Sequence, residues 1–425
     1  MLCGKIFKKH AFFVIFAPTD GSGPSRAARP PTLHHIEMKH TYLLLAPLLA
    51  LLLAACHDSP DDPWDDVETA DKTVFVFMPY TGSDDNDLYP AFQQNLNDMA
   101  AAIDDAHGLG RSRLVAFVAD RNGQSGRLIS FAYRRGRTVR DTLKTYPSRE
   151  TYLTATGRVA LLRDVQHCAP AATYAMIVGC HGEGWLPASS AKKVQTRYFG
   201  GASVAYLIDV ADFAASLSQA GLHLQYLLFD DCYMSGVEVA YALRGVTDRL
   251  IASTSEMMGY GMPYRKIMGQ LLAVQPDYGV VCSEFRKFYE SYSMPYGTIG
   301  VTDCRVIGEM AALMAEANAA HTFGGDADAT VQDLDGRHFT PTVYFDFGSY
   351  TRRLCQGDEA LLSRYEALLA RLVPYKACTD YIYSQQGSQR TRLTEFSGLA
   401  ISDPSANARV ATAKKETEWW KATHE

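Results

Sequence analysis

The sequence predicts an α/β protein with a mostly parallel sheet sandwiched by helices and a smaller C-terminal region. Short apolar runs rich in β-branched residues alternate with longer stretches of helical spacing, and the runs are apolar on both faces, as in covered parallel sheets. With 47% hydrophobic and 21% charged residues, the 425-residue chain is too apolar for a disordered protein and has the composition of a globular one.

The expected elements follow one another along the chain. Strands are expected at residues 74–78, 114–119, 174–180, 226–229 and 250–253, and helices at 88–103, 204–220 and 237–243. A helix that connects two strands of one sheet makes them parallel. After about residue 278 the pattern is more mixed, with helices expected at 309–320 and 359–372 and strands at 343–350 and 399–402. We therefore expect a main domain at 73–277 and a C-terminal region at 278–425 that completes the fold.

Charge and cysteine spacing argue against nucleic-acid binding and against a zinc site. A net charge of -6 and an isoelectric point near 6.1 do not provide the basic face that nucleic-acid binding usually needs. Of the nine cysteines, Cys3 and Cys56 precede the folded body, and the odd number that remains leaves at least one unpaired. No C-x-x-C pair occurs, so we expect no zinc site.

The first 72 residues do not belong to the predicted fold. The run TYLLLAPLLALLLAA at 41–55 carries no charge but is shorter than the about 20 residues that span a bilayer, so it is interpreted as the core of a signal peptide at 38–55. It leads into LAAC at 53–56, which resembles a bacterial lipobox and implies cleavage before Cys56 and acylation of that cysteine. The alternative is a plain secretory signal with a chance cysteine.

The segments on either side of this signal peptide are also expected to lie outside the fold. Met38 would be a normal start, so residues 1–37 are interpreted as a mis-called gene start, with a real N-terminal extension as the alternative. Residues 56–72 hold seven acidic residues and two prolines, so we expect an extended, self-repelling tether. Together these segments predict a protein of the cell envelope, attached to the outer membrane or cell surface through a lipid at Cys56.

Two loops at the ends of expected strands carry a histidine and a cysteine. His181 lies in CHGEGW at 180–185, after the third strand, and Cys232 lies in DDCYMSG at 230–236, after the fourth. One helical stretch separates the two strands, so they are expected to be parallel neighbours. Open α/β sheets place their sites at the carboxyl ends of such strands. We therefore expect His181 and Cys232 to meet at one edge of the sheet.

A cysteine and a histidine side by side suffice for nucleophilic catalysis. The thiolate is the nucleophile, and an imidazole can take its proton and return it to a leaving amine. The backbone N–H groups of Gly182 and Cys232 are the predicted oxyanion donors. A lone cysteine after a strand is more often a buried core thiol, and a lone His-Gly is more often a turn. Their coincidence at matched strand ends favours catalysis.

These segments resemble the clostripain family of cysteine peptidases, which are relatives of caspases, gingipains and legumain. The family's motifs are matched by HGEGW at 181–185, FDDCYM at 229–234, EVAY at 238–241, AS at 252–253 and MGYGMPY at 258–264. Similarity runs over about residues 73–405. The resemblance implies a caspase-like fold and an endopeptidase for polypeptide substrates, with Cys232 as nucleophile and His181 as general acid and base.

The resemblance also implies cleavage after Arg or Lys, because the specificity pocket of the family is acidic. Asp230 matches one pocket acid, and a desolvated carboxylate can bind a guanidinium through two hydrogen bonds. At Tyr260, family members that cleave after Arg or Lys tend to carry a second Asp, whereas this chain has a phenol that can hydrogen-bond or face a cation. Glu256 or Asp231 would then be the compensating acid, and a solvated loop acid is the alternative for Asp231.

A polar loop at 187–201 separates the two motifs and carries Lys192, Lys193 and Arg197. Exposed loops of this kind are readily cut, and some family members cut themselves between the histidine and the cysteine, so self-processing near these residues is a hypothesis. A solvated basic loop is the alternative. Some relatives need Ca²⁺, but DDND at 84–87 lacks the glycine and the distant glutamate of a calcium loop and is interpreted as a helix cap. No cofactor is assigned, and Ca²⁺ is left open.

The competing function is a catalytically silent surface lipoprotein that uses the same scaffold for binding. The presence of both His181 and Cys232 favours the peptidase, because a pure binder needs neither. A serine or metallo-hydrolase is not supported, since the sequence has no G-x-S-x-G or H-E-x-x-H motif. The other histidines of the body are interpreted as surface or core imidazoles without partners: His107, His167, His223, His321 and His338.

Overall fold

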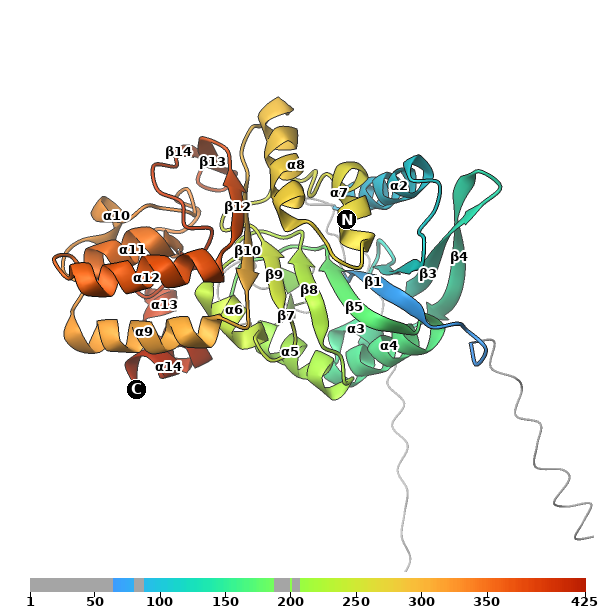
Figure 1. Cartoon of the computed structure of the whole chain (residues 1–425), viewed down its shortest axis with the longest axis horizontal. Coiled ribbons are helices and arrows are strands. Elements are labelled where there is room, and N and C mark those ends of the chain that lie inside the picture. Colours follow the sequence, from blue (N-terminus) through green and yellow to red (C-terminus); the bar gives the residue numbers. More distant parts are fainter. Residues whose placement is uncertain (1–63, 80–87, 187–198, 201–206) are drawn as a thin grey trace, which may run out of the picture. The chain divides into compact units, whose positions relative to one another are not determined.

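Nine strands form one sheet in the computed structural model, which describes residues 64–79, 88–186, 199–200 and 207–425 (Figure 1). The middle of the sheet is parallel, in the order β9 (Arg249–Ala252), β8 (Leu224–Phe229), β5 (Ala171–Val178), β1 (Ala70–Met78) and β2 (Ser112–Ala119). Antiparallel strands continue from β2 and from β9, namely β3 (Gly126–Arg134) and β4 (Arg137–Tyr146), and β10 (Thr298–Asp303) and β12 (Tyr375–Cys378). The predicted, mostly parallel α/β sheet is confirmed.

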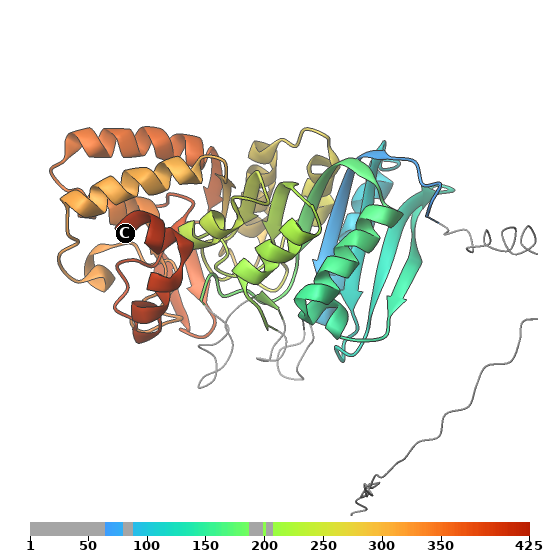
Figure 2. The ribbon, with the colours of Figure 1, turned by 90° about the horizontal axis from the view of Figure 1, so that it is seen from below.

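Helices cover both faces of this sheet (Figures 1 and 2). One face carries α2 (Tyr89–Asp105), α7 (Tyr264–Leu272) and α8 (Tyr278–Ser291), and the other carries α4 (Ala155–Cys168), α5 (Val210–Gln219) and α6 (Val237–Leu243). The C-terminal region adds α9 (Ile307–Ala320), α11 (Phe347–Leu354), α12 (Glu359–Leu372) and α14 (Glu418–His424). Shorter elements are α3 (Glu150–Leu153), β6 (Phe199–Gly200), β7 (Leu207–Ile208), α10 (Ala327–Thr330), β11 (Phe345–Asp346), β13 (Tyr381–Ser384), β14 (Gln389–Arg392), β15 (Ala400–Ile401), α13 (Ala408–Ala413) and a 3-10 turn at Lys414–Glu416.

The central strands are buried because helices cover both faces of the sheet. Val74 and Val76 of β1, and Leu227 and Leu228 of β8, expose no surface. This burial explains why the strands carry apolar side chains at successive positions instead of an alternating pattern. Each such side chain contributes about 1.5–3 kcal/mol through the hydrophobic effect. The edge hairpin of β3 and β4 is more exposed and correspondingly more polar.

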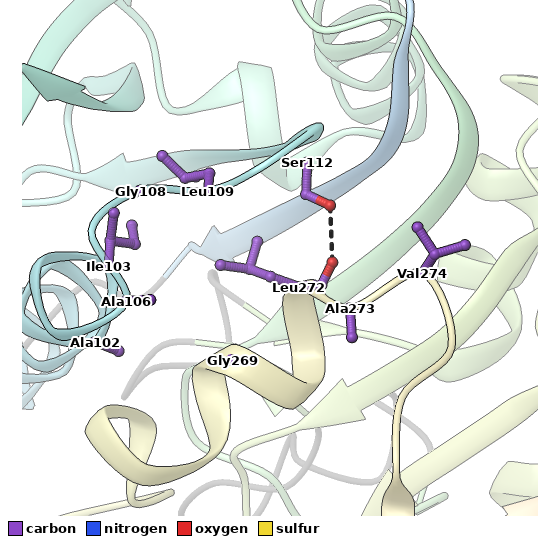
Figure 3. Close-up of a pocket in the computed structure, with 10 residues that line it drawn as sticks. All are labelled: Ala102, Ile103, Ala106, Gly108, Leu109, Ser112, Gly269, Leu272, Ala273 and Val274. Atoms are coloured by element: carbon purple, nitrogen blue, oxygen red, sulfur yellow. Dashed lines mark hydrogen bonds between the residues drawn. The ribbon is translucent and has the colours of Figure 1, made fainter.

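A buried lysine caps the carboxyl end of α7. Lys72 of β1 is fully buried, and its Nζ donates a hydrogen bond of 2.9 Å to the carbonyl oxygen of Ala273. The same Nζ lies 4.7 Å from the ring centre of Tyr226. Next to it, the Ser112 hydroxyl donates to the carbonyl oxygen of Leu272 at 2.8 Å (Figure 3). The last carbonyl groups of a helix lack intrahelical donors, and these two side chains satisfy them. Burial lowers the pKa of Lys72 to about 7.

A cavity of about 210 Å³ lies beside this cap, between α2 and α7 (Figure 3). Its mainly apolar lining consists of Ala102, Ile103, Ala106, Gly108, Leu109, Ser112, Gly269, Leu272, Ala273 and Val274. Ser112 is the first residue of β2, so the cavity lies at the amino ends of the parallel strands. His181 and Cys232 follow the carboxyl ends of β5 and β8. The cavity is therefore separate from the predicted site.

Several expected boundaries differ in the structure, and β1 begins at Ala70, inside the segment expected to be an extended tether. Strand β5 spans Ala171–Val178, so the strand predicted at 174–180 begins three residues too late and ends two residues too late. Of the helix expected at 204–220, α5 begins only at Val210, and 207–208 form β7, because the extended backbone of Asp209 starts the helix at that point. The strand expected at 343–350 is wrong beyond β11. There the Asp346 carboxylate accepts the Ser349 N–H at 2.8 Å and caps α11.

The C-terminal region is bound to the main sheet by more than β10 and β12. Strand β15 lies beside the loop that follows β8, where the Ala400 N–H donates to the carbonyl oxygen of Ser235 at 2.8 Å. The Ser235 hydroxyl in turn donates to the carbonyl oxygen of Gly398 at 2.9 Å. Trp419 of α14 is fully buried and packs edge-on against Tyr241 of α6. The end of the chain therefore contacts the segment that carries the predicted nucleophile.

We expect Lys72→Met to remove a pH dependence of the stability. The folded state holds Lys72 largely neutral above about pH 7, whereas the unfolded chain keeps it protonated up to about pH 10. Between these values the unfolded state binds more protons, so the Lys72 contribution to the free energy of unfolding rises with pH, by up to about 1.4 kcal/mol per pH unit. Urea unfolding between about pH 7 and 10 measures this slope.

The matched control for this substitution is Lys266→Met, which changes an exposed lysine of α7. It should keep the slope of the wild type. If Lys72→Met and the wild type gain stability equally with rising pH, the assignment of a largely neutral Lys72 is wrong.

Candidate active site

The carboxyl ends of β5 and β8 lie side by side. The strands pair in parallel with Val178 opposite Phe229, and the Asp230 N–H donates to the carbonyl oxygen of Val178 at 2.8 Å. His181 is the third residue after Val178, and Cys232 is the third after Phe229. The two loops therefore leave the same edge of the sheet at the same level, as the sequence predicted for neighbouring parallel strands.

Glycine at position 182 allows the two loops to touch. A Cβ atom on Gly182 would lie 2.6 Å from the Cβ of Asp231, 2.6 Å from the carbonyl oxygen of Cys232 and 3.1 Å from its backbone nitrogen. These distances are too short for any side chain, so the backbone after His181 is in direct contact with the backbone of Cys232. The two predicted oxyanion donors, the N–H groups of Gly182 and Cys232, belong to these touching segments.

Asp231 holds the two loops together through hydrogen bonds to Cys180. Its Oδ1 accepts the Cys180 N–H at 2.6 Å, and its Oδ2 accepts the Cys180 thiol at 3.3 Å. Asp231 is buried, and burial raises its pKa to about 8. The alternative, that Asp231 is a solvated loop acid, is therefore wrong. Cys180 is also buried, which raises the pKa of its thiol well above the ordinary value and makes it unreactive.

The backbone of His181 is held by a short antiparallel bridge. Its N–H donates to the carbonyl oxygen of Gly200 at 3.0 Å, and the Gly200 N–H donates back at 2.8 Å. The His181 side chain is half-buried, and this burial lowers its pKa to about 4. The imidazole is therefore neutral at physiological pH and has a ring nitrogen that can accept a proton.

The Cys232 thiol faces a loop that follows β9. Its Sγ accepts the Met257 N–H at 3.2 Å. Burial, together with the negative charge of Glu256, raises the pKa of the thiol well above its ordinary value, so the free protein holds a neutral thiol. The next residue, Tyr233, has a φ of 61°, in the left-handed region that non-glycine residues rarely adopt, and its ring stacks on Tyr344. The backbone therefore turns sharply at Tyr233, directly after Cys232.

Asp230 is a buried carboxylate under the loop that contains Tyr260. Only 7% of its surface is exposed, and its Oδ2 accepts the Tyr264 hydroxyl at 2.8 Å and the Asn95 amide at 3.4 Å. Gly261, with a φ of 66°, lies so close that a Cβ there would be 2.5 Å and 2.7 Å from the two carboxylate oxygens. Burial raises the pKa of Asp230 to about 6.

Tyr260 does not take the position of a second buried acid. Its side chain is 49% exposed, and its ring centre lies 4.2 Å from that of Tyr292, at the end of α8. A hydrogen bond between the two phenols raises the pKa of Tyr292. Tyr260 and Tyr292 therefore form an aromatic pair at the surface, next to Gly261 and above Asp230.

Glu256 and Glu183 lie close to His338, a histidine for which no partner was expected. The Glu256 Oε2 accepts the Gln385 N–H at 3.0 Å and lies 3.9 Å from Nδ1 of His338. The Nε2 of the same imidazole lies 3.6 Å from the Oε1 of Glu183. The expectation that His338 has no partner is wrong. It is also wrong for His167, His223 and His321, which pair with aspartates, and for His107, whose Nδ1 lies 3.4 Å from the Tyr133 hydroxyl. Nothing local in the sequence signals these contacts, because the partners are distant along the chain.

Several predicted residues lie outside the described parts of the chain. These are Cys56, the acidic run at 84–87, and the processing candidates Lys192, Lys193 and Arg197. Within the described ranges, no group of three or more His, Cys, Asp or Glu side chains is arranged to hold a metal ion. None of the helices in those same ranges combines the length and the apolar character that a membrane crossing requires.

Comparison with known proteins identifies relatives of this architecture. The model of the clostripain family matches residues 157–334. A secreted C11 cysteine protease from Bacteroides thetaiotaomicron, "iotapain", is 41% identical and superposes with a TM-score of 0.78, over 84% of this chain and 100% of its own. A clostripain from the same organism, crystallised with the peptide inhibitor BTN-VLTK-AOMK, is 46% identical over 53% of this chain and 99% of its own, with a TM-score of 0.51.

A third solved structure has a more distant sequence. It is an inactive zymogen C11 protease from Parabacteroides distasonis, which is 25% identical and covers 84% of this chain and 100% of its own, with a TM-score of 0.72. No curated protein matches the chain. On the identity and coverage of the first structural relative, the chain belongs to the clostripain (C11) family and is a cysteine peptidase.

Proposed function

We propose that the protein is a lipid-anchored endopeptidase in which Cys232 attacks the peptide carbonyl and His181 transfers the protons. The observation that carries this proposal is the backbone contact of Gly182 with Cys232, which brings the two loops together at one edge of the sheet. The neutral state of both side chains also supports it, because a neutral imidazole can accept the proton of a neutral thiol as the bond to carbon forms.

The proposed reaction has an acylation half and a deacylation half, each with two proton transfers. His181 takes the Sγ proton as the sulfur attacks the carbonyl carbon, and the negative oxygen is bound by the N–H groups of Gly182 and Cys232. The protonated imidazole then gives its proton to the departing amine, which leaves an acyl group on Cys232. A water molecule hydrolyses this thioester, with His181 taking a proton from the water and returning it to the sulfur.

Basic specificity is the second part of the proposal. Asp230 lies on the same loop as Cys232, two residues before it, and its buried carboxylate can bind the guanidinium or ammonium group of a substrate side chain. The exposed Tyr260 ring pairs with the half-buried Tyr292 ring, and both can face the same cation. A clostripain that is 46% identical binds an inhibitor whose peptide, VLTK, ends in Lys, which agrees with this preference.

Removing either side chain of the dyad should abolish turnover without unfolding the protein. We expect Cys232→Ala to be inactive, and His181→Ala to lose about 10²–10⁴-fold in kcat/KM, the usual contribution of general acid–base catalysis. Fluorogenic peptides ending in Arg, Lys or a neutral residue measure the activity. His321→Ala, which removes an imidazole far from the thiol along the chain, should retain activity. A wild type without turnover on any of these peptides would favour the silent surface lipoprotein.

The preference for basic residues should depend on pH through Asp230. Only the ionised carboxylate attracts a cation, and burial raises the pKa of Asp230 to about 6, so the preference for Arg over its neutral isostere citrulline should fall as the pH drops through 6. Asp230→Asn should lower this preference about 10–100-fold and make it independent of pH. Tyr260→Asp should raise Arg cleavage. A preference that persists unchanged in Asp230→Asn would remove Asp230 from the pocket.

Self-processing between His181 and Cys232 is the third part of the proposal. The segment at 187–198 is followed by Phe199, which is buried, and by Gly200, which is bonded to His181. We expect wild type to be cut after Lys192, Lys193 or Arg197, and Cys232→Ala to remain one chain. Mass spectrometry of the purified proteins identifies the cut, and Cys282→Ala, a buried cysteine of α8, serves as control. Equal cutting of wild type and Cys232→Ala would show that another protease does it.

The lipid anchor at Cys56 is supported by the lipobox-like LAAC at 53–56. We expect wild type to incorporate labelled palmitate in a bacterial host and to sediment with membranes, because acylation adds a large apolar group to the tether. Cys56→Ser should be unlabelled and soluble. Labelling of Cys56→Ser, or a soluble wild type, would instead favour a plain secretory signal, as in the relative that is described as secreted.

A further inference from the structure

We propose that Tyr264 is a positioning residue of the specificity pocket, which binds one carboxylate oxygen of Asp230 and leaves the other oxygen for the cation of a substrate side chain. This role rests on the proposed function of Asp230 as the pocket acid. Tyr264 is the first residue of α7, and its side chain is fully buried.

The two oxygens of the Asp230 carboxylate have different surroundings. Oδ2 accepts the Tyr264 hydroxyl at 2.8 Å and, over a longer distance of 3.4 Å, the Asn95 amide. Oδ1 is buried and has no hydrogen-bond partner among the described residues. A buried polar atom without a partner is costly to fold, and in native proteins such an atom calls for a functional explanation. Oδ1 is therefore the atom that a guanidinium or ammonium group would bind.

The Tyr264 hydroxyl is a fixed donor. Its ring exposes no surface, and the Tyr264 N–H donates to the carbonyl oxygen of Met262 at 2.8 Å. The adjoining Gly261 is held in turn, because the Tyr289 hydroxyl of α8 donates to its carbonyl oxygen at 3.0 Å. A binding group is oriented precisely when its own partner cannot turn away. The packing around Tyr264 thus fixes which oxygen of Asp230 stays free.

Near pH 7 an ionised Asp230 is surrounded by neutral groups. Burial raises the pKa of its neighbour Asp231 to about 8 and holds the other neighbouring pKa values well above their ordinary range. The ionisable side chains that interact with Asp230 are Asp231, Cys180, Tyr264 and Tyr289. None of these supplies a positive charge, so the substrate side chain provides the counter-charge for the buried carboxylate.

The hydrogen bond from Tyr264 keeps the pocket acid ionised. Burial raises the pKa of Asp230 to about 6, and the Tyr264 hydroxyl is the largest influence that lowers it, followed by the Met262 N–H. A donor to the ionised carboxylate stabilises the charged form. The phenol itself stays protonated, because burial raises the pKa of Tyr264 well above its ordinary value. It therefore donates throughout the pH range in which Asp230 titrates.

The pH dependence of substrate preference measures this effect. The ratio of kcat/KM for an Arg peptide to that for the matching citrulline peptide cancels the titration of His181 and Cys232, because both peptides use the same dyad. In Tyr264→Phe, which keeps the ring and loses the hydroxyl, we expect the midpoint of this ratio to rise by about one pH unit. The ratio at pH 6 should then fall about fivefold, and at about pH 8 it should be close to that of wild type.

Two variants separate this role from a general loss of packing. Tyr152→Phe removes another buried hydroxyl, which donates to the carbonyl oxygen of Gly123 at 2.9 Å, and should keep the wild-type midpoint. Tyr264→Phe combined with Asp230→Asn should behave as Asp230→Asn alone, since the hydroxyl acts through the carboxylate. An unchanged midpoint in Tyr264→Phe, where Asp230→Asn loses the preference, would overturn the role of Tyr264 alone. A preference that survives in Asp230→Asn would overturn both roles.

Binding of benzamidine tests the pocket without turnover. Its amidinium group matches a guanidinium, and calorimetry with Cys232→Ala across pH gives its affinity. Adding Tyr264→Phe should raise the midpoint of binding by about one pH unit. Should that variant fail to fold, Tyr264→3-fluorotyrosine keeps the ring and strengthens the hydroxyl as a donor, so it should lower the midpoint. No binding of benzamidine at any pH, or a midpoint that fluorination leaves unchanged, would contradict the proposal.

Discussion

The close contact of Gly182 with the Asp231–Cys232 backbone is the constraint on which the site depends. Strands β5 and β8 are parallel neighbours in register, but register alone places only the strand ends side by side. The absence of a side chain at Gly182 lets the backbones meet, and the buried Asp231 carboxyl binds the following loop through the N–H and thiol of Cys180. The relative position of the His181 and Cys232 loops is thus produced by main-chain packing.

Burial shifts the pKa values of the ionisable side chains at this site. It lowers the pKa of His181 and raises that of Cys232, so the resting pair is imidazole and thiol and not an ion pair. The carboxyl groups around it, Asp230, Glu183 and Glu256, also have raised pKa values because each is removed from water. Such a buried, acidic surrounding opposes a free thiolate at Cys232.

The sequence predicted the parts of the fold that have strong local signals. Helices α6 and α12 have the predicted limits, and the five central strands lie where the apolar runs indicated. The hairpin of β3 and β4 was missed because its residues are half-exposed and polar, without the apolar run of a buried strand. The two catalytic candidates could be paired because one crossover makes their strands neighbours. His338 could not, because it reaches the site only through tertiary packing.

The contacts of β15 and His338 with the loops around His181 and Cys232 have a consequence for synthesis. Both belong to the last third of the chain, which a ribosome makes after His181 and Cys232. A growing chain that has already produced the thiol still lacks the backbone bond from Ala400 to Ser235 and the imidazole between the two glutamates. The order of translation therefore delays assembly of the complete set of contacts around His181 and Cys232 until almost the entire polypeptide is present.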